Sequence, residues 1–280
     1  MNSPNNGRRA VWLSFPLALL LVIASAAGVF LPSVYAVETR LSAAQFVGAD
    51  ALNLLVVVPV LIASAVLALC SWTGARVLWA GTVLYVLYAF VYYTLSLHFN
   101  SLFLVYCAVF GLSFYTLIGA LPRFPIPDIA SRSSGRRATA VATAILFLFI
   151  VLGAGFHWVD EISTALRTGR TPHSITDTGM LTETPAVLDI AFLLPALTVI
   201  AILLLRRRPL GLAIAPVFLV LTVYVALLLT AMDVMMVRRG LQPGDAGPVA
   251  YLAAAGIASV LLVLSLPSGT TEQRSDGCER

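Results

Sequence analysis

Eight continuous apolar blocks, each about the length of a membrane helix, constrain this chain more than any other feature. An α-helix needs about 20 apolar residues to cross roughly 30 Å of hydrocarbon, whereas a barrel strand needs only about 10 in an alternating pattern. The sequence therefore predicts an all-α, polytopic transmembrane bundle of eight helices. The blocks are Val11–Leu31, Ala51–Trp72, Val77–Leu97, Leu102–Leu121, Ala138–His157, Val187–Leu205, Leu210–Met232 and Val249–Leu266.

The composition supports a membrane protein and excludes an ordinary soluble domain. Of 280 residues, 60% are hydrophobic and 11% are charged, whereas a soluble domain carries about 25% charged residues. The formal charge of +4 is carried by arginine, since the chain has no lysine. The arginines lie at the ends of the blocks, so we interpret them as topology signals and expect a lipid bilayer as the partner rather than nucleic acid.

The arginine distribution predicts cytoplasmic N- and C-termini, because positive residues gather on the cytoplasmic side. Twelve arginines fall on the side of the N-terminus and five on the other side. An alternative is a signal peptide that begins at Arg8-Arg9 and is cleaved after Ser33–Ala36. Its apolar stretch is longer than the roughly 7–15 residues of a typical signal peptide, so we favour an uncleaved first span and leave cleavage open.

Blocks two to four resemble blocks six to eight, which predicts a parallel 4+4 internal repeat. Asn53 precedes Pro59 by six residues, and Asp189 precedes Pro195 by the same interval. The last blocks also share a spacing of tyrosine, glycine and proline: Tyr106, Gly111 and Pro122 match Tyr251, Gly256 and Pro267. Four spans per unit keep both halves in the same orientation, as in transporters whose substrate lies between parallel repeats.

The repeat predicts two halves joined by a basic cytoplasmic linker and flanked by polar tails. We expect an N-terminal tail at 1–10, a first half at 11–122, a linker at 123–137, a second half at 138–267 and a disordered tail at 268–280. Two long outer loops, at 32–49 and 158–186, occupy equivalent places in the two halves.

The predicted extracytoplasmic side gathers nine of the thirteen acidic residues and all three histidines. Asp50 and Asp189 fall at the outer starts of two spans, where a carboxylate also has a structural role against the positive end of a helix dipole. Asn53 lies one turn into its span, where an amide must bond to a neighbouring helix or to a ligand. Tyr85 and Tyr88 share one face of the third span. The candidate ligand-binding residues are Asn53, Asp189, Tyr85, Tyr88, Asp50 and Asp233.

The same acids and imidazoles admit a different hypothesis, a divalent metal that activates water. The candidate ligands for this alternative are His98, His157, Glu161 and Glu38. No pair of them has a recognised ligand spacing on one helix, and the leading hypothesis requires no cofactor.

Two stretches resemble segments of multi-pass bacterial membrane proteins that are themselves uncharacterised. They are Ala186-Val187-Leu188-Asp189-Ile190-Ala191-Phe192-Leu193-Leu194-Pro195 and Phe99-Asn100-Ser101-Leu102-Phe103-Leu104-Val105-Tyr106. The resemblance implies a protein of the bacterial cytoplasmic membrane and carries no catalytic residue with it.

These observations favour a protein that binds or transports a small molecule or lipid between its two halves. The alternatives are a membrane-embedded, metal-dependent hydrolase or transferase and a non-catalytic assembly partner. The sequence leaves open the ligand, any coupling ion and whether the chain forms a homo-oligomer.

Overall fold

The computed structural model describes residues 10–70, 72–241 and 247–266, and the predicted tails fall largely outside these ranges. The described residues are mainly helical, and no strand occurs among them. In chain order the elements are α2 (Ser14–Phe30), η1 (Pro32–Tyr35), α3 (Arg40–Leu52), η2 (Asn53–Val57), α4 (Val58–Leu69), α5 (Thr73–Ser96), α6 (Phe103–Ala120), η3 (Leu121–Arg123), α7 (Ile126–Ser133), α8 (Arg137–Thr168), α9 (His173–Thr178), α10 (Thr184–Leu188), η4 (Asp189–Leu193), α11 (Leu194–Leu205), α12 (Pro209–Arg238) and α13 (Gly247–Ser265).

Eight helices among the described residues are long and apolar enough to cross a membrane, which confirms the predicted all-α multi-pass architecture. Most ends agree with the apolar blocks to within a few residues. The second span differs most, because it begins at Arg40 rather than at Ala51, and the fifth continues to Thr168 rather than ending at His157. The predicted outer loops are therefore largely helical. Hydropathy ends a span at polar residues, whereas Ser42 and Asp50 continue the helix while buried against its neighbours.

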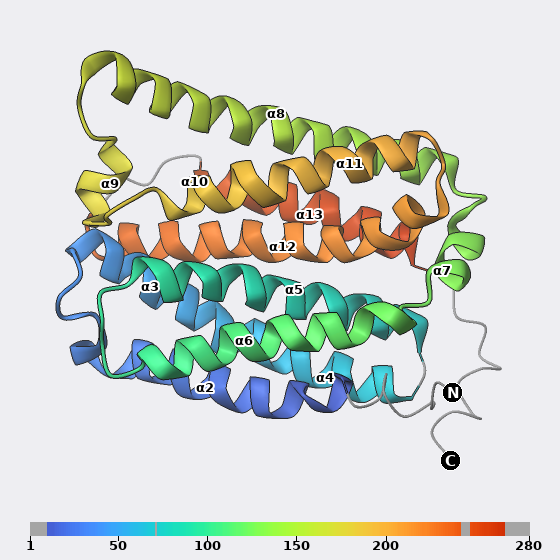
Figure 1. Cartoon of the computed structure of the whole chain (residues 1–280), viewed down its shortest axis with the longest axis horizontal. Coiled ribbons are helices and arrows are strands. Elements are labelled where there is room, and N and C mark those ends of the chain that lie inside the picture. Colours follow the sequence, from blue (N-terminus) through green and yellow to red (C-terminus); the bar gives the residue numbers. More distant parts are fainter. Residues whose placement is uncertain (1–9, 71, 242–246, 267–280) are drawn as a thin grey trace.

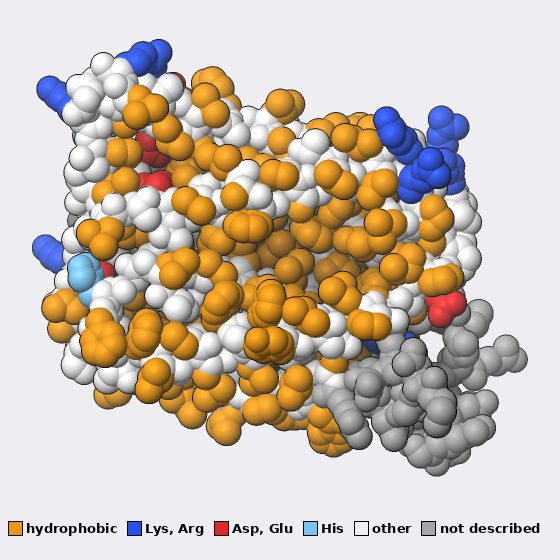
Figure 2. Space-filling model, in the orientation of Figure 1, with side chains coloured by type: hydrophobic (Ala, Val, Ile, Leu, Met, Phe, Trp, Pro, Cys, Tyr) orange, Lys and Arg blue, Asp and Glu red, His pale blue; other side chains and the backbone are white. Residues whose placement is uncertain are grey.

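The long helices lie side by side along the longest axis of the molecule (Figure 1). One end contains η1, the start of α3 and α9, and we call it the histidine end because His98, His157 and His173 lie there. We call the opposite end, with α7 and the turn between α11 and α12, the arginine end. Figure 2 shows arginine side chains gathered over that turn and an apolar surface between the two ends, as a membrane-embedded surface requires.

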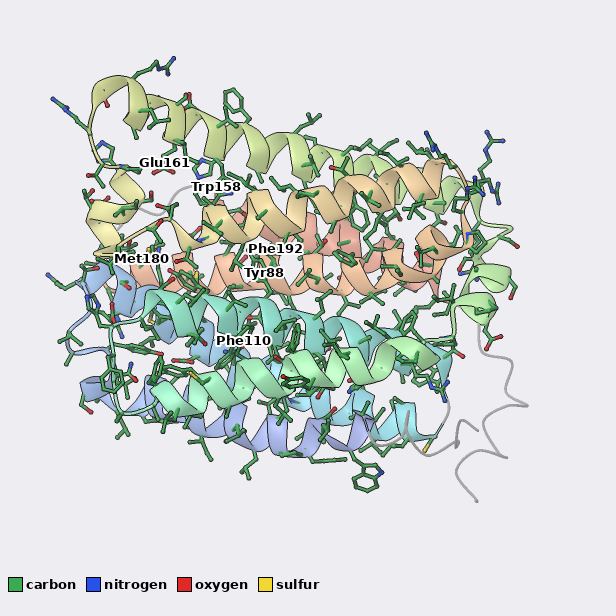
Figure 3. The ribbon with its side chains drawn as sticks, viewed as in Figure 1. Tyr88, Phe110, Trp158, Glu161, Met180 and Phe192 are labelled. Carbon is green, nitrogen blue, oxygen red and sulfur yellow. The ribbon has the colours of Figure 1, made fainter. Side chains whose placement is uncertain are left out.

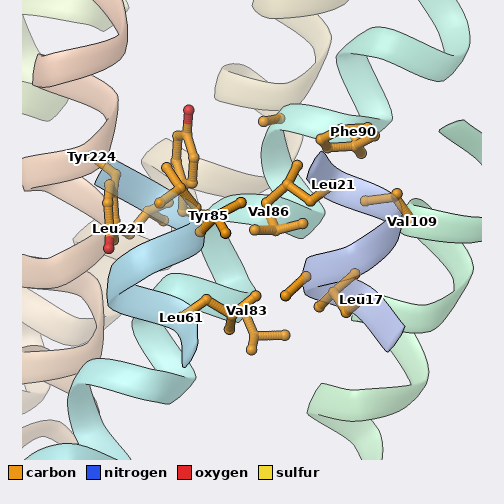
Figure 4. Packing of buried hydrophobic residues seen from close by; sticks show 14 of the residues in the cluster. Leu17, Leu21, Leu61, Val83, Tyr85, Val86, Phe90, Val109, Leu221 and Tyr224 are labelled. Carbon is orange, nitrogen blue, oxygen red and sulfur yellow. The ribbon is translucent and has the colours of Figure 1, made fainter. Parts of the chain in front are cut away.

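Two apolar cores meet along α12. The larger core joins α2 to α6 with one face of α12, and Tyr85 and Tyr224 stack within it at 4.8 Å between ring centroids (Figure 4). The smaller core joins α8, α11 and α13 with the other face of α12. Leu193 and Phe218 pack against both cores. The central helix α12 thus carries apolar side chains on both faces.

Glycines let α12 approach the first-half helices closely. A Cβ added at Gly48 of α3 would lie 2.5 Å from the Ala231 carbonyl oxygen, and one added at Gly81 of α5 would lie 2.4 Å from Val220 Cβ. Small residues at helix contacts allow this approach in membranes, where association depends on packing rather than on exclusion of water. The contact between the first half and α12 therefore depends on these two glycines.

Two spans contain a π-helical segment at matching positions. One runs from Asn53 to Val57 and the other from Asp189 to Leu193, and both have five residues. Pro59 and Pro195 follow each segment at the second position of the next α-helix. A proline lacks an N–H and clashes with the carbonyl four residues earlier, so a widened turn before it relieves the clash.

Candidate functional site

Asp189 lies between α5 and α8, and one side chain from each of these two helices binds its carboxylate. The Tyr88 hydroxyl of α5 donates a hydrogen bond to Asp189 Oδ1 at 2.8 Å, and the Trp158 indole nitrogen of α8 donates to Oδ2 at 2.9 Å. Asp189 itself begins the π-helical segment η4, and the chain there has been helical since Thr184. It therefore lies a little inside its span, which begins at Thr184, and its carboxylate accepts hydrogen bonds from side chains of α5 and α8.

Glu161 and Glu183 form a second acidic group around Ser174, and His157 interacts with both this group and Asp189. Ser174 donates to Glu161 Oε1 at 2.5 Å and lies 2.6 Å from Glu183 Oε2, so one hydroxyl lies between two carboxylates. His157 lies 3.8 Å from Glu161. Burial raises the pKa of Glu183 above its usual value. The Ser174 hydrogen bond opposes this shift, and repulsion from Glu161 adds to it.

Asn53, the predicted counterpart of Asp189, lies deep in the first half and is 1% exposed. The Tyr85 hydroxyl lies 3.4 Å from Asn53 Oδ1, a weak hydrogen bond, while Asn53 Nδ2 has no hydrogen-bond partner among the described residues. The four candidate residues thus form two separate contacts, Tyr85 with Asn53 and Tyr88 with Asp189. The tyrosines lie three residues apart on α5, so α5 connects the two polar positions.

Asp50 forms another site, fully buried within the first half. It accepts hydrogen bonds from Tyr35 at 2.5 Å and from Tyr93 at 3.0 Å. Because α3 begins at Arg40, Asp50 lies inside the helix rather than at its start. The helix-dipole interpretation of Asp50 is therefore wrong. Asp233 lies half-buried on α12.

The four candidate metal ligands form two separate pairs. Glu38 Oε2 lies 3.1 Å from His98 Nδ1, and the backbone N–H of His98 donates to Glu38 Oε1 at 2.9 Å. His157 pairs with Glu161 on α8. Over residues 10–70, 72–241 and 247–266, no three His, Cys, Asp or Glu side chains are grouped to hold a metal ion. The metal-dependent enzyme stays a prediction from the sequence.

A recessed apolar surface, which we call the groove, lies beside Tyr88, the residue that donates to Asp189. Helices α6 and α11 flank α5 and α12, which pack on each other. Figure 2 shows the surface between α6 and α11 to be recessed and apolar. Figure 3 places Tyr88 between Phe110 of α6 and Phe192 of η4, and Phe192 is 67% exposed. A polar carboxylate thus lies beside an exposed apolar surface.

Several residues of this site were not predicted from the sequence. Trp158 was assigned to a loop, and Ser174 and Glu183 were not singled out. Their signal is present only in three dimensions, because α8 continues past the apolar block and α9 folds back onto it. Tyr35, which lies within the alternative cleavage motif, is not a predicted site residue either, because its contact with Asp50 joins two different elements.

Searches of protein-family models, of curated proteins and of solved structures find no match to this chain.

Proposed function

We propose that the protein binds an amphipathic small molecule or lipid between its two halves, with the polar group at Asp189 and the apolar part in the groove between α6 and α11. The observation that carries the proposal is the contact of Asp189 with Tyr88 and Trp158 beside the exposed Phe192. A carboxylate adjoining an apolar groove suits a molecule with one polar and one apolar part.

The polar group that suits this site is a hydrogen-bond donor. Asp189 accepts hydrogen bonds from both of its protein partners, and Glu161 and Glu183 lie in the adjoining acidic group. A hydroxyl or an amine can replace Tyr88 or Trp158 as donor, whereas an anionic headgroup would be repelled. The proposed ligand therefore has a hydroxyl- or amine-bearing headgroup.

The two sides of the site belong to the two halves of a parallel 4+4 repeat. The matching five-residue π segments, with Asn53 and Asp189 as their first residues and prolines at the same distance, support the repeat. In this arrangement the hydrogen bond between Tyr88 and Asp189 joins the two halves. If the protein also transports its ligand, this hydrogen bond breaks as the halves separate.

The orientation we propose places the histidine end outside the cytoplasm of a bacterial cell and the arginine end inside. The exposed Arg206, Arg207 and Arg208 at the arginine end support it, because arginine-rich turns stay on the cytoplasmic side.

Photo-crosslinking tests the location of the ligand. The photoreactive amino acid p-benzoylphenylalanine replaces Phe192 in the groove, and a matched variant carries it at Phe149, which is 73% exposed on α8. The protein is reconstituted in vesicles of phosphatidylethanolamine and phosphatidylglycerol, irradiated and analysed by mass spectrometry.

We expect position 192 to capture the amine-bearing phosphatidylethanolamine in excess over its share of the vesicle, and this excess to disappear with Asp189→Asn. Position 149 should capture both lipids in their bulk ratio. If the two positions give the same ratio, the groove holds only bulk lipid and the proposal is wrong.

A further inference from the structure

The second buried carboxylate, Asp50, has an environment that the proposed ligand site does not use. It is 0% exposed in the middle of the first half. Hydroxyl groups surround it from three directions: Tyr35 of η1, Tyr93 of α5 and, beside it on α2, Ser25. Ionisable groups this deep in a membrane bundle are rare because burying their charge is costly, which makes Asp50 a candidate functional group.

Neutral groups face the Asp50 carboxylate from each of these elements. The titratable groups that interact with it are tyrosines, namely Tyr35, Tyr93, Tyr85 and Tyr106. Glu38 interacts with Tyr106. Among the described contacts of Asp50, no arginine or histidine balances its charge. A proton is the simplest cation that can do so.

The shape of the site also favours a proton over a metal ion. Tyr35 occupies Oδ2 and Tyr93 occupies Oδ1, so both carboxylate oxygens already have partners. On the α2 side the backbone closes the site, since a Cβ added at Gly28 would lie 1.8 Å from Asp50 Oδ2. A coordinated metal ion needs several oxygen ligands around open space, which this site does not offer.

Two further buried hydroxyls adjoin the site. Ser25 is 0% exposed beside the Asp50 carboxylate, and Tyr106 is 1% exposed beside Tyr35. Tyr106 lies close enough to influence both Tyr35 and Asp50. A hydroxyl both donates and accepts hydrogen bonds, so these two groups extend the set of hydroxyls around Asp50 that can hold or pass on a proton.

Tyr35 connects this site to the histidine end. A hollow of about 460 Å³ opens there, lined by Tyr35, Ala36, Glu38, Arg40, Arg239 and Leu241. The same Tyr35 donates to Asp50. Burial and the Asp50 charge raise the pKa of Tyr35 far above its usual value, so the hydroxyl stays protonated and remains a donor.

We propose that Asp50 is a proton-binding site that exchanges its proton with the hollow at the histidine end through the Tyr35 hydroxyl. In the exchange, Tyr35 gives its proton to Asp50 Oδ2 as it accepts another from a hydronium ion in the hollow, which is left as water. Asp50 becomes a neutral carboxylic acid and Tyr35 keeps one proton throughout. The charge buried among α2, α3, α5 and α6 thus follows the proton concentration at the histidine end.

Infrared spectroscopy of the full-length protein in lipid nanodiscs tests the proposal. A protonated carboxylic acid has its own carbonyl stretching band, and this band shifts when the proton is replaced by deuterium. The wild type is compared with Asp50→Asn and with Asp160→Asn, which removes an exposed acid on α8. We expect a band in the wild type and in Asp160→Asn that is missing in Asp50→Asn.

The path is tested by two matched variants, each of which removes one hydroxyl that donates to Asp50. Tyr35→Phe removes the group that lines the hollow, whereas Tyr93→Phe removes the other donor, which is 1% exposed. We expect Tyr35→Phe to slow the deuterium shift of the band about tenfold or more, and Tyr93→Phe to leave the rate close to that of the wild type.

Both variants keep Asp50, so they remain informative if Asp50→Asn does not fold. A wild-type protein without the band at any pH would contradict proton binding. Equal exchange rates in the wild type, Tyr35→Phe and Tyr93→Phe would contradict the path through Tyr35.

Discussion

The Tyr88 hydroxyl donates to Asp189 Oδ1 at 2.8 Å and thereby joins α5 of the first half to the π-helical segment η4 of the second. Trp158 donates to the other carboxylate oxygen, so the carboxylate is held from two helices. Both donors are neutral. The carboxylate therefore keeps its capacity to bind a polar group that competes with either one.

Removal of the Tyr88 hydroxyl should weaken the contact between the halves. Tyr88→Phe leaves Asp189 Oδ1 without its donor in a partly buried site, and an unpaired acceptor of this kind costs about 1–3 kcal/mol. We expect a lower midpoint of thermal unfolding in detergent. Tyr115→Phe is the matched control, because Tyr115 is 66% exposed on α6. Equal midpoints for the two variants would show that the hydrogen bond does not stabilise the protein.

Glu183 should make stability depend on pH in a defined direction. Its folded-state pKa lies above the ordinary value of 4.5. At pH values between the ordinary pKa of the unfolded chain and the raised pKa of the folded protein, the folded protein binds more protons than the unfolded chain. The free energy of unfolding therefore falls as pH rises through this window. Glu183→Gln should reduce this fall, whereas Asp160→Asn should keep it. The measurement is the thermal midpoint across the pH range. The opposite result would be a thermal midpoint that rises with pH in the wild type but not in Glu183→Gln. That result would contradict the prediction.

The close contact of α5 with α12 should not tolerate a side chain at Gly81. Gly81→Leu would place atoms onto Val220 and the Val217 carbonyl, and overpacking of this kind typically costs 1–3 kcal/mol. Gly111→Leu on α6 is the control, because a Cβ there meets nothing within 4 Å. We expect Gly81→Leu to aggregate at a lower temperature on size-exclusion chromatography after heating, and Gly111→Leu to match the wild type. The reverse order would rule out tight packing at Gly81.

Thr39 joins the start of α3 to the segment that carries α9. Its hydroxyl accepts from the Ser42 N–H at 3.1 Å and donates to the Asp177 carbonyl at 2.9 Å. Thr39→Ala should cost about 0.5–2 kcal/mol through loss of the cap and loosen the segment that carries α9, so that trypsin cleaves faster at the exposed Arg167 and Arg170. Thr39→Ser retains the hydroxyl and should behave like the wild type. Equal cleavage rates in Thr39→Ala and Thr39→Ser would contradict the role of the hydroxyl.

The spans were predictable because hydropathy alone determines which segments can enter a bilayer. The second span shows the limit of this signal. Its apolar part begins at Ala51, but the helix begins at Arg40, and Ser42 and Asp50 between them are buried. Burial against other helices makes polar residues tolerable there, and hydropathy of a single segment does not record its neighbours.

The candidate site shows a similar division. Tyr85 and Tyr88, grouped by their spacing on α5, contact two of the other candidate residues, Asn53 and Asp189. The partners that complete each site come from distant segments. Trp158 precedes Asp189 by 31 residues, and Tyr93 follows Asp50 by 43. Spacing within one helix carries no information on such contacts.

The most direct test of the proposed function is native mass spectrometry of the protein extracted in mild detergent from the membranes of the cells that express it. Wild type, Asp189→Asn and the control Asp160→Asn are compared at matched collision energy. We expect a stoichiometric amphipathic molecule with a hydroxyl- or amine-bearing headgroup on the wild type and on Asp160→Asn, and its loss from Asp189→Asn. Retention of the same molecule by Asp189→Asn would contradict the claim that Asp189 holds the polar group.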